Sequence, residues 1–180
     1  MNILGVDPSL TATAFCGPSD WRMYTLDEEV SSIKRNEMRL IKIRRRMIDL
    51  ATHADLVVIE GFSYGSKFKQ HDLGGLGWIL RLALWENQIP YAVIPPTKRA
   101  KYATGNGRAG KLDVFSACIK QLDLDPKDDN QSDAAWLRAM GLDAYDRLDV
   151  KLPKAQRAML KDVEWPEVNG YTLTEILLRG

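Results

Sequence analysis

Two short apolar runs in this chain end in acidic residues. The first covers residues 1–7 and ends at Asp7, and the second covers residues 55–61 and contains Glu60. A short apolar run followed by turn residues is typical of a buried β-strand. Each acid is therefore expected at the carboxyl end of a strand, where the sheets of α/β proteins usually place ligands.

Further strands and helices follow from the spacing of the apolar positions. Residues 11–16, 21–26 and 91–94 are β-prone segments bounded by turn residues, which brings the expected strands to five. Helical periodicity, with apolar residues three or four positions apart, is found in most of the remaining chain. The expected helices cover residues 31–54, 73–87, 97–104, 108–122 and 130–146.

Two of these helices carry features with more than one interpretation. The helix over residues 31–54 has a basic row formed by Arg35, Arg39, Lys42 and Arg46. This row is equally compatible with a solvated face and with contact to phosphates. Gly74, Gly75 and Gly77 would weaken the next helix. They indicate the close approach of another backbone, either in the core or at a subunit contact.

The composition is that of an ordinary globular protein with one domain. The chain has 180 residues, of which 45% are apolar and 27% charged, and its formal net charge is +1. No apolar run approaches the length of a membrane span, and the start of the chain lacks the pattern of a secretion signal. The two cysteines lack CxxC spacing and are expected to be reduced intracellular thiols.

A third acid, Asp133, precedes the apolar start of a helix. Our hypothesis is that Asp7, Glu60 and Asp133 converge, hold divalent metal and cut a phosphodiester backbone, because Mg²⁺ prefers carboxylate oxygens. Each acid also has a plainer interpretation: Asp7 in a turn, Glu60 as a surface acid, and Asp133 as a helix N-cap. Zinc chemistry is not expected, because His53 and His71 have no partners at ligand spacing.

Two segments have the composition of nucleic-acid-binding loops. Residues 61–72 combine rings that stack on bases with cations that meet phosphates, namely Phe62, Tyr64, Lys67 and Phe68. In the alternative interpretation these rings cap the core. The other segment surrounds a glycine-rich turn at 105–107 and carries cations without an acid, namely Lys98, Arg99, Lys101, Arg108 and Lys111. Such a loop can bring backbone N–H groups to a phosphate.

Five segments of the chain form a recognisable series: ILGVDPS at 3–9, VVIEGF at 57–62, LGGLGWILRLAL at 73–84, PYAVIPPTKRAKYATGNGRAGKLDV at 90–114 and SDAAWL at 132–137. In order and spacing they resemble the RuvC family of Holliday-junction resolvases within the RNase H-like superfamily. The segment at 90–114 is the most specific of these. The resemblance covers roughly residues 1 to 145, and its divergent sequence is most like the phage members of the family.

The resemblance implies an α/β protein with an RNase H-like fold, in which helices flank a central mixed five-stranded sheet. It also implies a homodimer that nicks four-way DNA junctions, with other branched DNA as further substrates. The implied cofactor is Mg²⁺, for which Mn²⁺ can substitute, at two ions per site. The expected domains are a nuclease domain over residues 1–150 and a C-terminal extension over 151–180, packed on it or trailing from it. The expected location is the cytoplasm, that of the bacterial host cell if the chain is phage-encoded.

The resemblance also assigns roles to individual residues. The family's catalytic acids fall on Asp7, Glu60 and Asp133, and its two supporting lysines on Lys111 and Lys101. The match at Lys101 needs a deletion of one residue. With Asp129 added, the four acids are the expected catalytic and metal-binding set, with Lys111 as a catalytic residue. DNA contacts are expected from Phe62, Tyr64, Lys67, Phe68, Lys98, Lys101 and Arg108.

The chain departs from the family pattern at two positions. The family has an acid or a histidine three residues before its last Asp, where this chain has Asn130. Asp129 lies on the same helical face as Asp133 and replaces that residue if the helix begins early enough, while Asn130 could ligate metal through its carbonyl oxygen. The family's stacking Phe after the Glu motif is Ser63 here, with Phe62 or Tyr64 as substitutes.

Two other functions compete with the nuclease. The first is a catalytically inactive module that binds branched DNA, and it is motivated by Asn130. The second is an actin-like ATPase, a group that also begins with a strand ending in Asp. That group shows DxG after the strand and is about twice as long, whereas here Pro8 follows Asp7.

Overall fold

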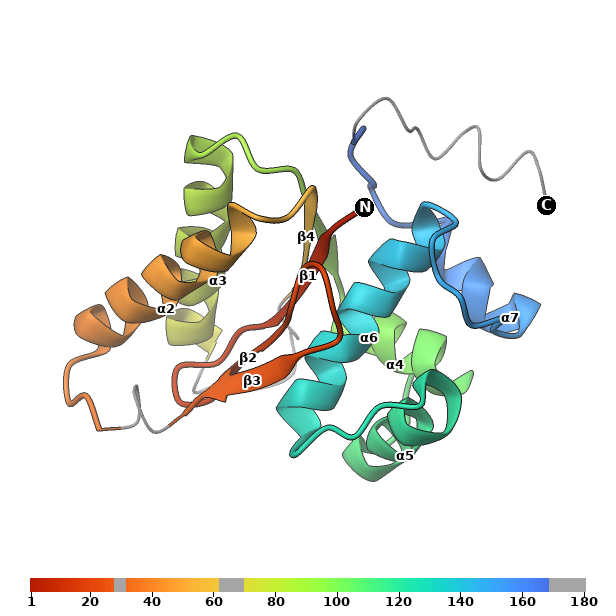
Figure 1. Cartoon of the computed structure of the whole chain (residues 1–180). Coiled ribbons are helices and arrows are strands. Elements are labelled where there is room, and N and C mark those ends of the chain that lie inside the picture. Colours follow the sequence, from red (N-terminus) through yellow and green to blue (C-terminus); the bar gives the residue numbers. More distant parts are fainter. Residues whose placement is uncertain (28–31, 62–69, 169–180) are drawn as a thin grey trace.

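The computed structural model describes residues 1–27, 32–61 and 70–168. Within these residues a five-stranded sheet lies between two layers of helices (Figure 1). The strands are β1 (Ile3–Asp7), β2 (Thr13–Cys16), β3 (Met23–Leu26), β4 (Leu56–Glu60) and β5 (Tyr91–Ile94). Their order in the sheet is β3-β2-β1-β4-β5. β1 pairs antiparallel with β2 and parallel with β4, which confirms the predicted mixed sheet.

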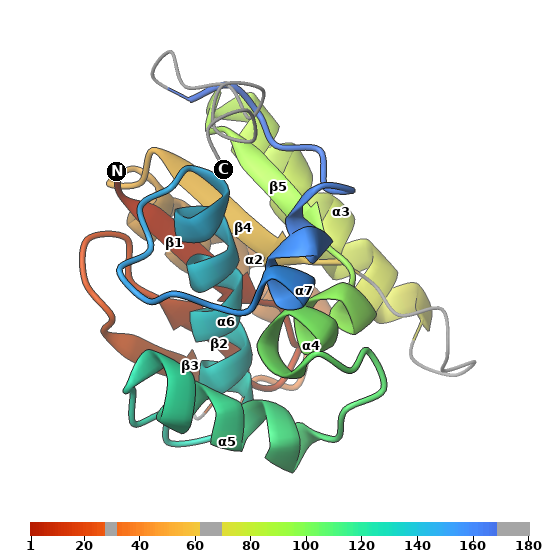
Figure 2. The ribbon, with the colours of Figure 1, turned by 90° about the vertical axis from the view of Figure 1, so that its right-hand side faces the viewer.

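Helices cover both faces of the sheet. α2 (Asn36–Ala51) and α3 (Gln70–Glu86) lie on one face, and α6 (Asp129–Ala144) covers the other (Figure 1). Figure 2 looks onto the α6 layer and shows the other helices around α6. These are α4 (Pro96–Thr104), α5 (Lys111–Leu122), α7 (Lys154–Arg157) and the 3₁₀ helix η1 (Ala158–Leu160). No helix in the part of the chain that the structure describes is long and apolar enough to cross a membrane.

Alternate residues of the central strands fill two separate cores. Ile3 of β1 and Val58 of β4 belong to the core under α6, while Leu4 and Val57 belong to the core under α2 and α3. This is the two-residue period of a strand, whose successive side chains point to opposite faces of the sheet. By the same alternation, Asp7 faces the α6 layer.

α6 approaches β1 closely because Gly5 has no side chain. A Cβ atom at Gly5 would lie 2.0 Å from the carbonyl oxygen of Ala134 and 2.8 Å from the backbone nitrogen of Arg138. A Cβ atom at Gly141, further along α6, would lie 2.8 Å from a methyl carbon of Val58. Glycines at two points of contact therefore set the distance between α6 and the central strands.

The first turn of α5 begins later than the sequence suggested. The helix was expected from Arg108, but it begins at Lys111. The backbone N–H of Arg108 donates to Asn106 Oδ1 (3.0 Å), which keeps this segment in a turn. Asp113 Oδ2 then accepts the N–H of the residue before the helix (3.1 Å) and closes its first turn. The start of α2, at Asn36 instead of residue 31, is the other such difference.

The C-terminal residues that the structure describes pack against α4 and α6. Leu152, Leu160, Val163 and Val168 are buried in the same core as these helices. Gln156 Nε2 donates to the carbonyl oxygen of Ala103 at the end of α4 (2.8 Å). Residues 151–168 are thus in contact with α4.

Gly5→Ala is expected to destabilise the chain by at least about 3 kcal/mol, because the added methyl group has to displace a helix backbone. Gly74→Ala is the matched control, since a Cβ at Gly74 would meet no atom within 4 Å. Alanine there should leave the stability unchanged or raise it by up to about 1 kcal/mol. Urea unfolding of both variants measures the difference, and equal effects would contradict the close approach at Gly5.

Candidate active site

Asp7 and Glu60 lie side by side at the carboxyl ends of β1 and β4. The two strands are parallel and Val6 pairs with Ile59, so each acid follows that pair by one residue. The alternation of the strands directs both side chains toward the α6 layer. Asp7 is buried and Glu60 is half-buried. Two carboxylates are therefore held together at one rim of the sheet.

Asp133 reaches the same rim from α6. It immediately precedes Ala134, whose carbonyl oxygen lies over Gly5 of β1. α6 begins at Asp129 and is capped by Asp128, whose carboxylate accepts a backbone N–H of the first turn (2.7 Å). Asp133 therefore lies one turn inside the helix, and its interpretation as an N-cap is wrong.

Arg99 of α4 joins the acids from the two layers. Its Nε donates to Glu60 Oε1 at 2.5 Å, and its Nη1 donates to Asp133 Oδ1. The Arg99 side chain is 9% exposed, and those of Glu60 and Asp133 are 14% and 15% exposed. The guanidinium group thus links the end of β4 to α6 in a poorly solvated place, where such charge-assisted bonds are strong.

Burial and like charges raise the pKa values of two of the acids. The pKa of Asp7 is raised well above its ordinary value of 3.8, chiefly by burial and also by Glu60 and Asp133. Burial also raises the pKa of Asp133, to about 7, against the opposing effect of Arg99. Burial alone would lower the pKa of Arg99, but the two acids that it bridges outweigh this effect and raise it. Protons and the guanidinium group together compensate the clustered negative charge.

Asp129 and Lys111 form a second ion pair near the first. Lys111 Nζ donates to Asp129 Oδ2, and this bond is the main cause of the lowered pKa of Asp129 and of the raised pKa of Lys111. The Lys111 side chain is 79% exposed. Asp129 lies one turn before Asp133, so both carboxylates lie on the same face of α6. The early start of α6 that this arrangement required is present.

The donor atoms at this rim suit a hard divalent cation, because they are carboxylate oxygens. In residues 1–27, 32–61 and 70–168, however, no three His, Cys, Asp or Glu side chains are arranged as a ready-made metal site. Arg99 bonds to two of the carboxylates and supplies positive charge there. The acids therefore fit a metal in their chemistry and their location, with a side-chain cation already among them.

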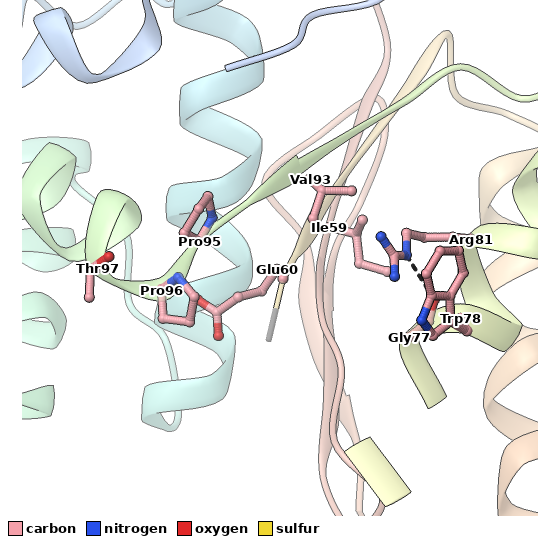
Figure 3. A pocket seen from close by; sticks show the side chains of 10 residues that line it. Ile59, Glu60, Gly77, Trp78, Arg81, Val93, Pro95, Pro96 and Thr97 are labelled. Carbon is pink, nitrogen blue, oxygen red and sulfur yellow. Dashed lines mark hydrogen bonds between the residues drawn. The ribbon is translucent and has the colours of Figure 1, made fainter. Parts of the chain in front are cut away.

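A cleft of about 620 Å³ opens beside Glu60 (Figure 3). Glu60 and Pro96 line one side of it, and Trp78 and Arg81 of α3 line the other. The guanidinium carbon of Arg81 lies 4.0 Å from the centroid of the Trp78 ring. The cleft thus places the Trp78 ring and the Arg81 guanidinium group across from the carboxylate of Glu60.

The residues expected to bind DNA occupy different surroundings. Lys101 and Arg108 are exposed on α4 and on the loop after it. Lys98 is turned toward the C-terminal residues, where its Nζ donates to the carbonyl oxygen of Asp162 (3.0 Å). The remaining residues expected in this role lie outside the described part of the chain. They are Phe62, Tyr64, Lys67 and Phe68.

Sequence reasoning gave Arg99 no role in the site. It was counted with the neighbouring cations of the 98–111 segment, most of which are exposed. A signal was present, because Arg99 lies three and four positions before Tyr102 and Ala103, which are buried residues of α4. A cation on the apolar face of a helix needs an acidic partner inside the protein.

The raised pKa of Asp133 leads to an expected dependence of stability on pH. The folded chain keeps a proton on Asp133 that the unfolded chain releases near pH 3.8, so the resulting stability is present below that pH and is lost as the pH rises toward about 7. In metal-free buffer, the wild-type chain should therefore lose on the order of 1–3 kcal/mol between pH 4 and 7 relative to Asp133→Asn, which has no such proton. Urea midpoints measured across this range test the expectation, and parallel pH profiles would contradict it.

No protein-family model matches this chain. The chain is 27% identical over 143 residues to the crossover junction endodeoxyribonuclease RuvC of Prochlorococcus marinus strain AS9601, with 74% of this chain and 91% of that protein covered. The protein of the same name from strain MIT 9211 is 27% identical over 154 residues, with 81% and 96% covered.

Solved structures show the same fold. A structure of T. thermophilus RuvC in complex with a Holliday junction substrate matches with a TM-score of 0.63 at 18% identity, and 77% of this chain and 90% of that chain are covered. A second Thermus thermophilus RuvC structure matches with a TM-score of 0.59 at 16% identity, covering 84% and 100%. This chain is therefore similar in sequence to RuvC proteins over most of its length, and it shares the fold of the solved RuvC structures.

Proposed function

We propose that this chain is a structure-selective endonuclease that resolves four-way DNA junctions, with other branched DNA as further substrates, by metal-dependent hydrolysis of phosphodiester bonds. The observation that carries the proposal is the meeting of Asp7, Glu60 and Asp133 at one rim of the sheet. The substrate is inferred from the relatives, which are named crossover junction endodeoxyribonucleases, and from the neighbour that was solved with a Holliday junction.

The metal in this proposal is Mg²⁺, replaceable by Mn²⁺, with two ions per site. Asp7, Glu60, Asp129 and Asp133 would hold the ions. When bound, they supply positive charge at the scissile phosphate and activate the attacking water. Asp129 is preferred to Asn130 because its carboxylate lies one turn before Asp133 on the same helical face. Lys111, exposed beside Asp129, would meet a phosphate oxygen of the substrate.

DNA would approach this rim over the loop between α4 and α5. Lys101, Arg108 and Lys111 are exposed there, close in sequence and free of intervening acids. Exposed cations of this kind contact the phosphates that supply most of the affinity for DNA. Lys98 and the aromatic segment with Phe62 remain candidates on the basis of the sequence resemblance. Junction DNA as the substrate implies a cytoplasmic location, in a bacterial host cell if the chain is phage-encoded.

The chain is also proposed to act as a homodimer through α3. Trp78, Leu82 and Trp85 are 67%, 53% and 71% exposed and lie at helical spacing on this helix. Gly75 is exposed three residues before Trp78, and a Cβ at this glycine would meet nothing within 4 Å. An apolar stripe with a small residue at one end suits a twofold contact between helices, and two equivalent sites match the paired strands of a junction.

Asp7→Asn is expected to bind a synthetic four-way junction but to nick it at least about 10²–10³-fold more slowly than the wild type in Mg²⁺. The reason is that the substitution removes an acid from the centre of the cluster without touching the exposed cations. Binding is measured by fluorescence anisotropy and nicking on a gel. Unchanged nicking would remove Asp7 from the mechanism. A wild-type chain that binds junctions but never nicks them, in Mg²⁺ or Mn²⁺, would instead make this a DNA-binding module without catalytic activity.

Leu82→Glu is expected to convert the dimer to a monomer, because it buries a charge in the apolar stripe of α3. Leu112→Glu is the matched control, since Leu112 of α5 is 81% exposed and lies outside this stripe. Light scattering coupled to size-exclusion chromatography gives the mass of each. Dimers of both variants, or a wild-type monomer at micromolar concentration, would contradict the proposed contact.

A further inference from the structure

The bridge made by Arg99 occupies one carboxylate oxygen of each of two acids that would also hold a metal ion. Arg99 Nε lies 2.5 Å from Glu60 Oε1, and Nη1 is bonded to Asp133 Oδ1. A bound Mg²⁺ would lie about 2.1 Å from carboxylate oxygens of this set. An ion on those oxygens would be within a few ångströms of the guanidinium group, so two positive charges would repel in a poorly solvated place.

The backbone of α4 is held in place, so any adjustment falls to the Arg99 side chain. Tyr102 donates its hydroxyl to Asp143 Oδ2 of α6 (2.8 Å). Gln156 of the C-terminal residues donates to the carbonyl oxygen of Ala103 (2.8 Å). Tyr102 and Ala103 both lie within the turn of α4 that follows Arg99. The helix therefore cannot withdraw the cation as a unit without breaking buried hydrogen bonds.

A hollow beside Arg99 gives its side chain room to move. It has a volume of about 170 Å³ and lies between α4 and α5, next to Asp133 and Lys111. Arg99, Gly107 and Ala109 are also among the residues that line it. A guanidinium group that left Glu60 could enter this space and remain near Asp133, where its charge would still be compensated.

We propose that Arg99 is a resident cation that joins Glu60 and Asp133 in the metal-free protein and releases at least one of them when a divalent metal binds. This inference rests on the proposed function, because it concerns the same acids. It makes the metal affinity of this chain depend on the breaking of a buried ion pair. Removal of the positive charge therefore strengthens metal binding and weakens the metal-free fold.

The test is a titration of the whole chain with Mn²⁺ in the absence of DNA, in which calorimetry measures the binding. Arg99→Gln is expected to bind Mn²⁺ at least about 10-fold more tightly than the wild type, because no cation has to be displaced. Its Tm should be lower than that of the wild type without metal, and Mn²⁺ should raise it by more. Lys120→Gln is the matched control: it removes one exposed positive charge in the last turn of α5, at the opposite end of the helix from Lys111, and should leave the affinity within about 2-fold.

The outcomes separate this inference from the proposed function. Mn²⁺ binding that is lost in Asp7→Asn but no tighter in Arg99→Gln would overturn the role of Arg99 and leave the active site intact. Mn²⁺ binding that persists unchanged in Asp7→Asn would overturn the active site itself. If Arg99→Gln does not fold, Arg99→Lys decides the matter, because a lysine cannot bridge two carboxylates as a planar fork does. An Arg99→Lys chain with wild-type Mn²⁺ affinity would then contradict the proposal.

Discussion

The close contact of α6 with β1 is the constraint on which the site depends. Gly5 lets the backbone of α6 rest directly on the strand, at Ala134. The preceding residue, Asp133, is thereby brought to the rim where β1 and β4 end in Asp7 and Glu60. A larger residue at position 5 would lift the start of α6 from the sheet and separate the helix acid from the strand acids. The packing of α6 on β1 thus determines where Asp133 lies relative to Asp7 and Glu60.

The acids gathered at this rim repel one another, and the chain compensates their negative charge in more than one way. Asp7 is buried and its pKa is raised, so it retains a proton more readily than an exposed carboxyl group. Asp133 is paired with Arg99, and Asp129 with Lys111. Each of these means of compensation can also be withdrawn, by loss of a proton or by rotation of a side chain. A cluster neutralised in this way is stable without metal and still has oxygen ligands to offer to one.

The sequence predicted the architecture well because the strands have strong local signals. The runs that end in Asp7 and Glu60 mark β1 and β4, and apolar spacing located the helices to within a few residues at most ends. Arg99 was missed because its role depends on which face of α4 is buried, which a count of charges cannot reveal. The sequence alone did not decide whether residues 151–180 pack on the domain or trail from it, since the scattered apolar side chains of residues 151–168 have no periodicity and fill a surface that exists only after α4 and α6 have docked.

α4 connects the acidic site to residues 151–168, a connection that the sequence did not indicate. Its inner face presents Arg99 to the acids, while its last turn is held by Asp143 of α6 and by Gln156 beyond it. Lys98, on the first turn, is bonded to Asp162. Contacts at both ends of so short a helix leave it little freedom to shift, and the position of the cation follows from them. Residues 143–162 therefore help to determine the electrostatics of the site indirectly, through the helix that they hold in place.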